Sequence, residues 1–491
     1  MNEFLSLFSR HSSWIILAPE IGLTLLILSV LAFDLWTQIN RTKLIQWSIL
    51  GSALIGVILI PLSSSASGQI FQGAFQLDSF SIFLKEIFIV SCMVTLWIAH
   101  EFSETLKNRA SDFALLILMA TLGAFFLASA NDLITLFITI EWMTISLYVL
   151  TAYLRTDPYG LEAGTKYLIM GAFSSALFLY GISHVYGTTG SVRFDHIHTW
   201  LTLHPKDPLF LTGLLLILSG IGFKIASFPF HLWVPDVYQG APTPATAFLS
   251  VSSKTAGFAA LVRILFSVIG PEYFNWPVLI SLLSAATLLY GNLGALGQTN
   301  MKRLFGYSSI AHAGYLLMGI SCGTQRGMEA VIFYLTAYAI SNLLAFLVIV
   351  IANRELGEGE IIAYRGLAKK SPLLAGAFFV ALLSLGGIPP LGGFFGKFLV
   401  LEAAVHRGYL WLAMIGAVNV IVSLYYYLSI VKEMYFRHAA ELGANERKMN
   451  LRISTQTLLV ALVLFVVGIG VFQEPLLLLA KSSVHILFTN P

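Results

Sequence analysis

The sequence predicts an all-α polytopic membrane protein. Of its 491 residues, 57% are apolar and 11% are charged, which is too little charge to cover the surface of a soluble protein of this length. Apolar runs of about 20 residues recur from Trp14 to Phe488, and each can cross a hydrocarbon core of roughly 30 Å.

We expect about fourteen transmembrane helices, because that number of apolar segments has the length a bilayer requires. Between the second and third, the alternation of aromatic and polar residues over 68–77 predicts a short hairpin. The predicted spans cover residues 14–36, 44–66, 79–99, 112–129, 131–154, 161–187, 208–231, 242–268, 275–297, 301–322, 327–352, 372–405, 409–436 and 454–480.

Two predicted spans contain helix breakers. Span seven includes SGIGFKIASFPFHLWVP (219–235), and span twelve includes SLGGIPPLGGFFGKF (384–398). A broken helix inside a bilayer needs protein or water to satisfy the freed backbone groups. Ordinary proline kinks are the alternative. Because a lysine lies beside each break, and one break falls in each half of the chain, the pattern favours a transporter built from inverted repeats with discontinuous helices seven and twelve.

Charged side chains also fall inside the apolar segments. A charge at the bilayer centre costs about 2.5–3.5 kcal/mol on insertion scales, so such residues indicate a proton or ion pathway. The alternatives are snorkelling to an interface, most of all for Lys166, and a protonated, helix-packing carboxyl for Glu141. The candidates are Glu141, Lys166, Lys224, Lys254 and Lys397, with Lys85 closer to the edge of its segment.

Histidines add two further candidates. His312 falls near mid-span and could shuttle protons near pH 7, or it could be a buried imidazole bonded to a carbonyl. His231, at the end of span seven, has the same two interpretations. Lys85 and Glu86 are adjacent and cannot face each other on one helix, so we expect a lipid or subunit contact there. Glu20 is assigned no chemistry.

Electron carriers and nucleic acid are not expected. Cys92 and Cys322 are isolated, and the sequence has no haem-attachment motif, no dinucleotide-binding glycine motif and no basic tract. We therefore expect no bound cofactor or metal in this chain. Lys and Arg concentrate near the span ends that flank the loops after odd-numbered spans, including Arg303, Lys370 and Arg447, whereas the opposite side has fewer, among them Arg10 and Arg263. This distribution predicts that both termini face away from the cytoplasm.

Three blocks closely resemble the N-type subunit of bacterial NADH:quinone oxidoreductase, the counterpart of subunit 2 of mitochondrial complex I and a relative of Mrp-type cation/proton antiporter subunits. They are GFKIASFPFHLW with PDVYQGAPTPATAFLSVSSK (up to 254), GNLGALGQTNMKRLFGYSSIAHAGY (291–315) and LSLGGIPPLGGFFGKF (383–398), followed by YYYL (425–428). The match runs from about residue 131 to 428.

The resemblance implies fourteen helices, with inverted five-helix repeats at 111–270 and 271–437. These would follow an N-terminal three-helix segment (1–110) and precede a loop and a last helix (438–491). It also implies an ion pair between Glu141 and Lys224, with further proton-transfer roles carried by Lys166, Lys254, His312 and Lys397.

The function that the resemblance implies is proton translocation within respiratory complex I. NADH, FMN, iron–sulfur clusters and quinone would then be used by other subunits, the neighbours would be M-type and K-type subunits, and the location would be the bacterial inner membrane. The alternatives are an Mrp-type antiporter subunit without a redox partner and a non-transporting assembly scaffold. The N-type blocks favour the first, and the lysines at depth disfavour a scaffold.

Overall fold

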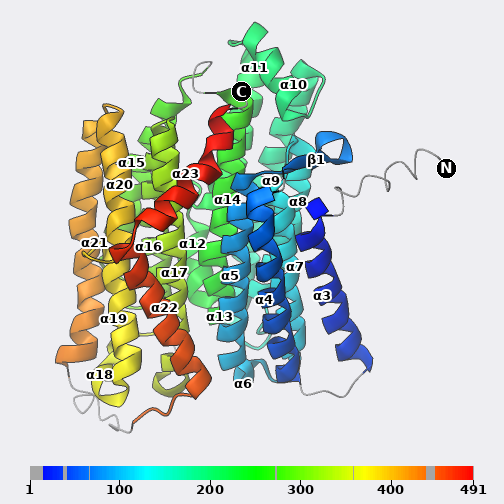
Figure 1. The fold of residues 1–491 in the computed structure, drawn as a ribbon. Helices are drawn as coiled ribbons and strands as arrows, with labels where there is room; N and C mark the ends of the chain where they lie inside the picture. The colour runs from blue at the N-terminus through cyan, green and yellow to red at the C-terminus, as the bar shows by residue number, and fades with distance from the viewer. Residues whose placement is uncertain are drawn as a thin grey trace.

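The computed structural model describes residues 15–36, 41–65, 67–270, 274–357, 359–437 and 448–489. Figure 1 shows most of its helices standing side by side in one bundle. In chain order the first half contains α3 (Ala18–Trp36), α4 (Arg41–Ser65), β1 (Gly68–Ile70), η1 (Phe71–Gly73), β2 (Phe75–Leu77), α5 (Ser79–Glu101), α6 (Ser103–Leu106), η2 (Lys107–Arg109), α7 (Ala110–Ala128), α8 (Leu133–Thr151), α9 (Pro158–Thr189), α10 (Phe194–Leu203), α11 (Pro208–Ile225), α12 (Trp233–Gly240), α13 (Thr243–Phe248), η3 (Leu249–Ser253), α14 (Lys254–Val262) and η4 (Arg263–Ile269).

The second half contains α15 (Trp276–Ala295), α16 (Met301–Ser321), α17 (Gln325–Leu356), η5 (Ile361–Tyr364), α18 (Leu367–Lys370), α19 (Pro372–Gly386), α20 (Gly392–His406), α21 (Leu410–Phe436), α22 (Ile453–Val471) and α23 (Glu474–Thr489). Strands β1 and β2 pair antiparallel, which confirms the predicted hairpin. Arg10 and Arg447 lie outside the described residues, and the predicted boundaries after residues 270 and 437 adjoin gaps in them.

Within the described ranges, twelve helices are long and apolar enough to cross a membrane. Two predicted spans are not among these twelve. One forms α16, which carries Lys302, Arg303 and His312, and the other divides into the shorter helices α19 and α20. The all-α membrane fold is therefore confirmed, whereas the total of fourteen spans and their repeat symmetry stay predictions.

Aspartates begin several of the long helices. Asp78, Asp132, Asp157 and Asp207 precede α5, α8, α9 and α11, and each carboxylate accepts a hydrogen bond from a backbone N–H in the first helical turn. Such caps satisfy donors that have no partner within the helix. They place the starts of these helices at defined positions in the sequence.

The two predicted breaks are present and end their first helices alike. Ala226 follows α11 at φ +60°, and Gly387 follows α19 at φ +86°. In each case the next residue donates a backbone hydrogen bond back to the turn it leaves, from Ser227 to Gly222 and from Ile388 to Leu383. This left-handed cap satisfies carbonyls that the helix end leaves free. The chain then resumes as α12 at Trp233 and as α20 at Gly392.

The predicted last span, 454–480, is wrong as a single helix. The helix α22 ends at Val471, and a second helix, α23, begins at Glu474. Pro475 explains the division, because proline has no N–H to continue the hydrogen-bond ladder of α22. In Figure 1, α23 (red) crosses obliquely over the bundle, and it packs against α5 and α17.

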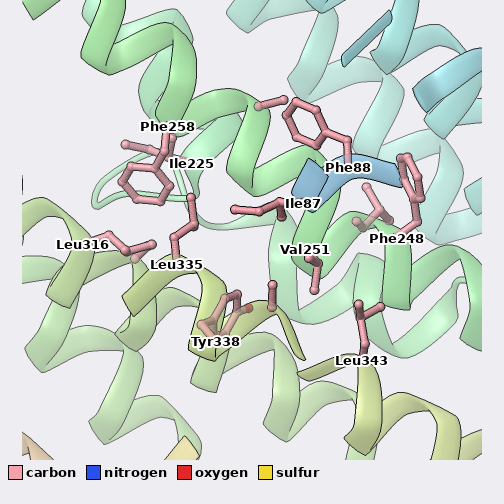
Figure 2. Close-up of a cluster of buried hydrophobic side chains, with 14 of the residues drawn as sticks. Ile87, Phe88, Ile225, Phe248, Val251, Phe258, Leu316, Leu335, Tyr338 and Leu343 are labelled. Carbon is pink, nitrogen blue, oxygen red and sulfur yellow. The ribbon is translucent and has the colours of Figure 1, made fainter. Parts of the chain in front are cut away.

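The most buried part of the bundle lies at α17 and at the segment Thr243–Ile269, each 94% buried over its most apolar stretch. Side chains from α5, α11, α13, η3, α14, α16 and α17 meet there, as Figure 2 shows. By contrast, only 28% and 33% of the most apolar stretches of α3 and α4 are buried. Because lipid is no less apolar than the side chains that face it, exposure of these outer helices is the expected state in a membrane.

Candidate functional site

The site begins with a carboxylate and an amine that approach without full contact. Glu141 on α8 and Lys224 at the end of α11 lie with Oε1 and Nζ 3.8 Å apart. The sequence predicted this approach, and the distance confirms it. Lys224 is buried, whereas the Glu141 side chain is 23% exposed.

Each member of this pair has a shorter contact with a hydroxyl. Lys224 Nζ donates to Thr144 Oγ1 at 2.7 Å, and Ser175 Oγ donates to Glu141 Oε1 at 2.6 Å. Thr144 lies on α8, one turn after Glu141, and Ser175 lies on the neighbouring helix α9. Reasoning from the sequence missed both hydroxyls, since nothing in the local sequence marks them.

Glu141 also lines a groove of about 1000 Å³ on the outside of α7, α8 and α9. The groove walls are largely aliphatic, and Arg109, Asp112 and Arg155 lie along its lining with Glu141. A carboxylate that faced lipid alone would be costly in a membrane.

Lys254 is the next buried amine. It begins α14, directly after the π-helical segment η3, and its Nζ donates to the backbone carbonyl of Ser309 on α16. One turn further along α14, an ideal Cβ on Gly257 would lie 3.2 Å from the Lys224 Cβ. A larger residue would force the two helices apart, so Gly257 allows α14 to pass close beside Lys224.

Glu141, Lys224, Lys254, His312 and Lys397 are together called the row below. His312, on α16, is the first of them in the second half of the chain. Its Nδ1 lies 2.5 Å from the Tyr334 hydroxyl, and its Nε2 lies 3.2 Å from the Tyr427 hydroxyl, which in turn lies 2.5 Å from Ser308 Oγ. These four side chains are buried, on α16, α17 and α21. Both ring nitrogens therefore bind side chains, and the alternative of an imidazole held by a backbone carbonyl is wrong.

Lys254, from the first half of the chain, and Lys397, from the second, both lie close enough for their charges to act on His312.

Lys397 lies just beyond the second break. Its Nζ donates to the carbonyl of Gly386, the last residue of α19, at 3.1 Å, and it lies 5.0 Å from the centre of the Tyr315 ring. Two glycines allow α20, which carries Lys397, to pack closely against α19 and α17. An ideal Cβ on Gly393 would lie 1.9 Å from the Ser384 carbonyl oxygen, and one on Gly396 would lie 2.4 Å from the Tyr334 ring.

Lys166 differs from the other lysines. Its side chain is 43% exposed and lies 2.6 Å from both Glu162 and Asp236. Arg303 on α16 also contacts Asp236, at 2.5 Å. The structure therefore places Lys166 in a partly exposed cluster of charges where α9, α12 and α16 meet, apart from the buried row.

Two buried ion pairs were not predicted. Lys85 Nζ lies 2.6 Å from Glu20 Oε1 and is fully buried, so the expectation of a lipid or subunit contact for Lys85 is wrong. Arg263, predicted near the end of the eighth span, is buried in η4 and contacts Asp78 at 2.7 Å. In each pair the two residues lie far apart in the sequence, and only tertiary packing brings them together.

His231 lies buried in the first break, with its ring centroid 3.9 Å from that of Tyr290. Neither of its ring nitrogens has a hydrogen-bond partner among the described residues. Nowhere among the described residues do three His, Cys, Asp or Glu side chains form a group that could hold a metal ion.

The fold and the site together define a multi-pass membrane protein in which a buried row of Glu, Lys and His side chains runs past two broken helices. Residues 130–423 match the family described as "NADH:quinone oxidoreductase/Mrp antiporter, TM". The chain belongs to this family, and within it to the N-type subunits.

Individual relatives agree over nearly the whole length. NADH-quinone oxidoreductase subunit N 2 of Chloroherpeton thalassium is 39% identical over 96% of this chain and 94% of that protein. A chain of respiratory complex I from Thermus thermophilus is 31% identical, with a TM-score of 0.79 over 94% of this chain and 99% of that one. A chain of the Mrp complex from Dietzia sp. DQ12-45-1b, 21% identical with a TM-score of 0.84 over 98% of both chains, shares the fold.

Proposed function

We propose that this chain is a proton-translocating membrane subunit of a complex I-type NADH:quinone oxidoreductase. The observation that carries the proposal is the Glu141–Lys224 pair, 3.8 Å apart beside a broken helix and followed by Lys254, His312 and Lys397. Charges this deep in a membrane protein are expensive unless they serve transport. The relatives named as subunit N support the same assignment.

The chemistry assigned to this row is proton exchange driven by changes in neighbouring charge. A carboxylate at Glu141 favours a charged Lys224, and moving or neutralising that carboxylate favours release of the lysine proton. Lys254 and His312 would receive and pass the proton onward, and Lys397 would be the last site. His312 suits this role because both of its ring nitrogens face hydroxyl groups, so that either can give or take a proton.

Electron transfer is assigned to other subunits, which would hold FMN and iron–sulfur clusters and would use NADH and quinone. M-type and K-type subunits are the proposed membrane neighbours, in a bacterial inner membrane with both termini away from the cytoplasm.

The groove at Glu141 is the proposed place where a neighbouring subunit's charge acts on the pair, because Glu141 is the member of the pair that is partly exposed. Residues 111–270 and 271–437 are proposed as the two inverted repeats, and Lys166, on α9 within the first repeat, as a further proton carrier.

Purification of the tagged chain from its native membrane tests this proposal. We expect flavin, iron–sulfur clusters and NADH:quinone activity to copurify with the chain, and the reconstituted assembly to acidify vesicles only while quinone is reduced. An Mrp-type antiporter would instead exchange cations for protons under an imposed gradient, without flavin, clusters or quinone reduction.

A further inference from the structure

Glu141 and Lys224 are not in direct contact, and each of them makes its closer contact with a hydroxyl group. A carboxylate and an ammonium in direct contact normally lie 2.7–2.9 Å apart, yet these two lie 3.8 Å apart. The close contacts are the ones that Lys224 makes with Thr144 at 2.7 Å and that Glu141 makes with Ser175 at 2.6 Å. Each hydroxyl takes a hydrogen-bonding position that the pair would otherwise use for itself.

Thr144 can only accept from the lysine. Its own hydroxyl proton points to the carbonyl of Ile140, at 2.6 Å, so a lone pair of Oγ1 faces Lys224 Nζ. Thr144 is fully buried, and no solvent competes for this contact. It therefore stabilises the charged lysine at a position withdrawn from Glu141.

Ser175 has one proton and two acceptors. Its Oγ lies 2.6 Å from Glu141 Oε1 and 3.0 Å from the carbonyl oxygen of Gly171, one turn earlier on α9. A single O–H cannot donate to both at full strength. When Glu141 is a carboxylate, Ser175 donates to it. When Glu141 is protonated, the carboxyl can donate to Ser175 Oγ, and the serine proton turns to Gly171.

We propose that Ser175 and Thr144 are positioning residues that keep the Glu141–Lys224 pair in its separated state, with the Ser175 hydroxyl turning between Glu141 and Gly171 as Glu141 loses and gains its proton. This inference rests on the proposed function of the pair. It adds a physical reason why the pair does not collapse into a permanent salt bridge, which would hold both charges in place and stop proton exchange.

The neighbouring serine provides a matched control. Ser174 lies on the same turn of α9, but its hydroxyl donates to the carbonyl of Gly220 on α11 at 3.0 Å and not to Glu141. Ser174→Ala therefore removes one buried hydroxyl from the same helix without touching the pair. Ser175→Thr keeps the hydroxyl and adds a methyl group at a partly buried position.

The test uses the assembled complex in proteoliposomes and measures the initial rate of vesicle acidification during quinone reduction. Ser175→Ala should slow acidification by about tenfold, which corresponds to about 1.4 kcal/mol, close to the lower limit for one hydrogen bond to a charged group. Ser175→Thr should restore it, and Ser174→Ala should leave it unchanged. Thr144→Val should behave as Ser175→Ala does, with rescue by Thr144→Ser.

Glu141→Gln separates failure of this inference from failure of the proposed function. If Glu141→Gln pumps normally, the proposed role of the pair is wrong. If Glu141→Gln abolishes pumping while Ser175→Ala pumps as wild type, or while Ser175→Thr is as impaired as Ser175→Ala, only the hydroxyl inference is overturned. In the Glu141→Gln background, Ser175→Ala should cause no further loss.

Discussion

Lys397 Nζ lies 3.1 Å from the carbonyl oxygen of Gly386, so the last amine of the row reaches back across the break to the end of α19. The carbonyls at the end of a helix carry partial negative charge, which favours a cation there. The break thus gives Lys397 a polar partner without an acidic side chain.

Replacing Gly387 with alanine should impair the second break. Gly387 has φ +86°, which costs other residues about 1 kcal/mol or more, and the new Cβ would lie 3.0 Å from Lys397 Cδ. We expect pumping to fall by severalfold while the complex still assembles. Gly376→Ala on α19 is the control, because nothing lies within 4 Å of its Cβ position. Equal activity of the two variants would contradict a functional role for the break.

Removal of a buried lysine should uncouple the chain. Lys224→Ala and Lys254→Ala should each lower proton pumping by about tenfold or more, as expected when a group that carries the transferred proton is lost. Coupled quinone reduction should fall with it. Assembly should persist, because alanine is a good helix former, the Glu141 carboxylate left by Lys224→Ala is partly exposed, and no acidic side chain among the described residues pairs with Lys254. Lys481→Ala, at an exposed position of α23, should pump normally. Vesicle acidification in reconstituted complex is the measurement.

The hydroxyl of Tyr427 should matter for pumping. Tyr427→Phe removes the hydroxyl that contacts both His312 Nε2 and Ser308 Oγ, and it preserves the ring. We therefore expect slower pumping with little change in thermal stability. Tyr334→Phe should act similarly from the Nδ1 side. Tyr425→Phe, in the same run of tyrosines but 68% exposed, is the matched control. A Tyr427→Phe complex with wild-type pumping would exclude this hydroxyl from the row.

The Glu20–Lys85 pair should contribute to stability. Removing one partner of a buried pair leaves an uncompensated charge, which typically costs about 3–5 kcal/mol. Lys85→Ala should therefore lower the melting temperature of the purified complex and its yield. A double replacement, Glu20→Gln with Lys85→Met, removes both charges and should recover much of this loss. If the single and double variants melt alike, the uncompensated Glu20 charge is not the cause of the loss.

Much of the fold was predictable because the bilayer imposes a simple rule. A span must be long and apolar, so most helices could be located from composition alone, and the clusters of Gly and Pro identified both breaks. Pro475, a single proline within an apolar run, was a weaker signal, and the division of α22 from α23 was missed. The family motifs singled out Glu141, Lys224, Lys254, His312 and Lys397, and the structure places Glu141 3.8 Å from Lys224 and brings His312 close to both Lys254 and Lys397.

The sequence by itself therefore determined the class of fold, the two breaks and the identities of the charged residues, because these depend on local composition and spacing. Only the tertiary structure decided which groups these residues contact. Lys85 meets Glu20, Lys166 meets Asp236, and Glu141 meets Ser175, each through packing between helices that no local pattern encodes. Helix packing sets these contacts to within about an ångström, and at that scale a hydroxyl group can separate an ion pair.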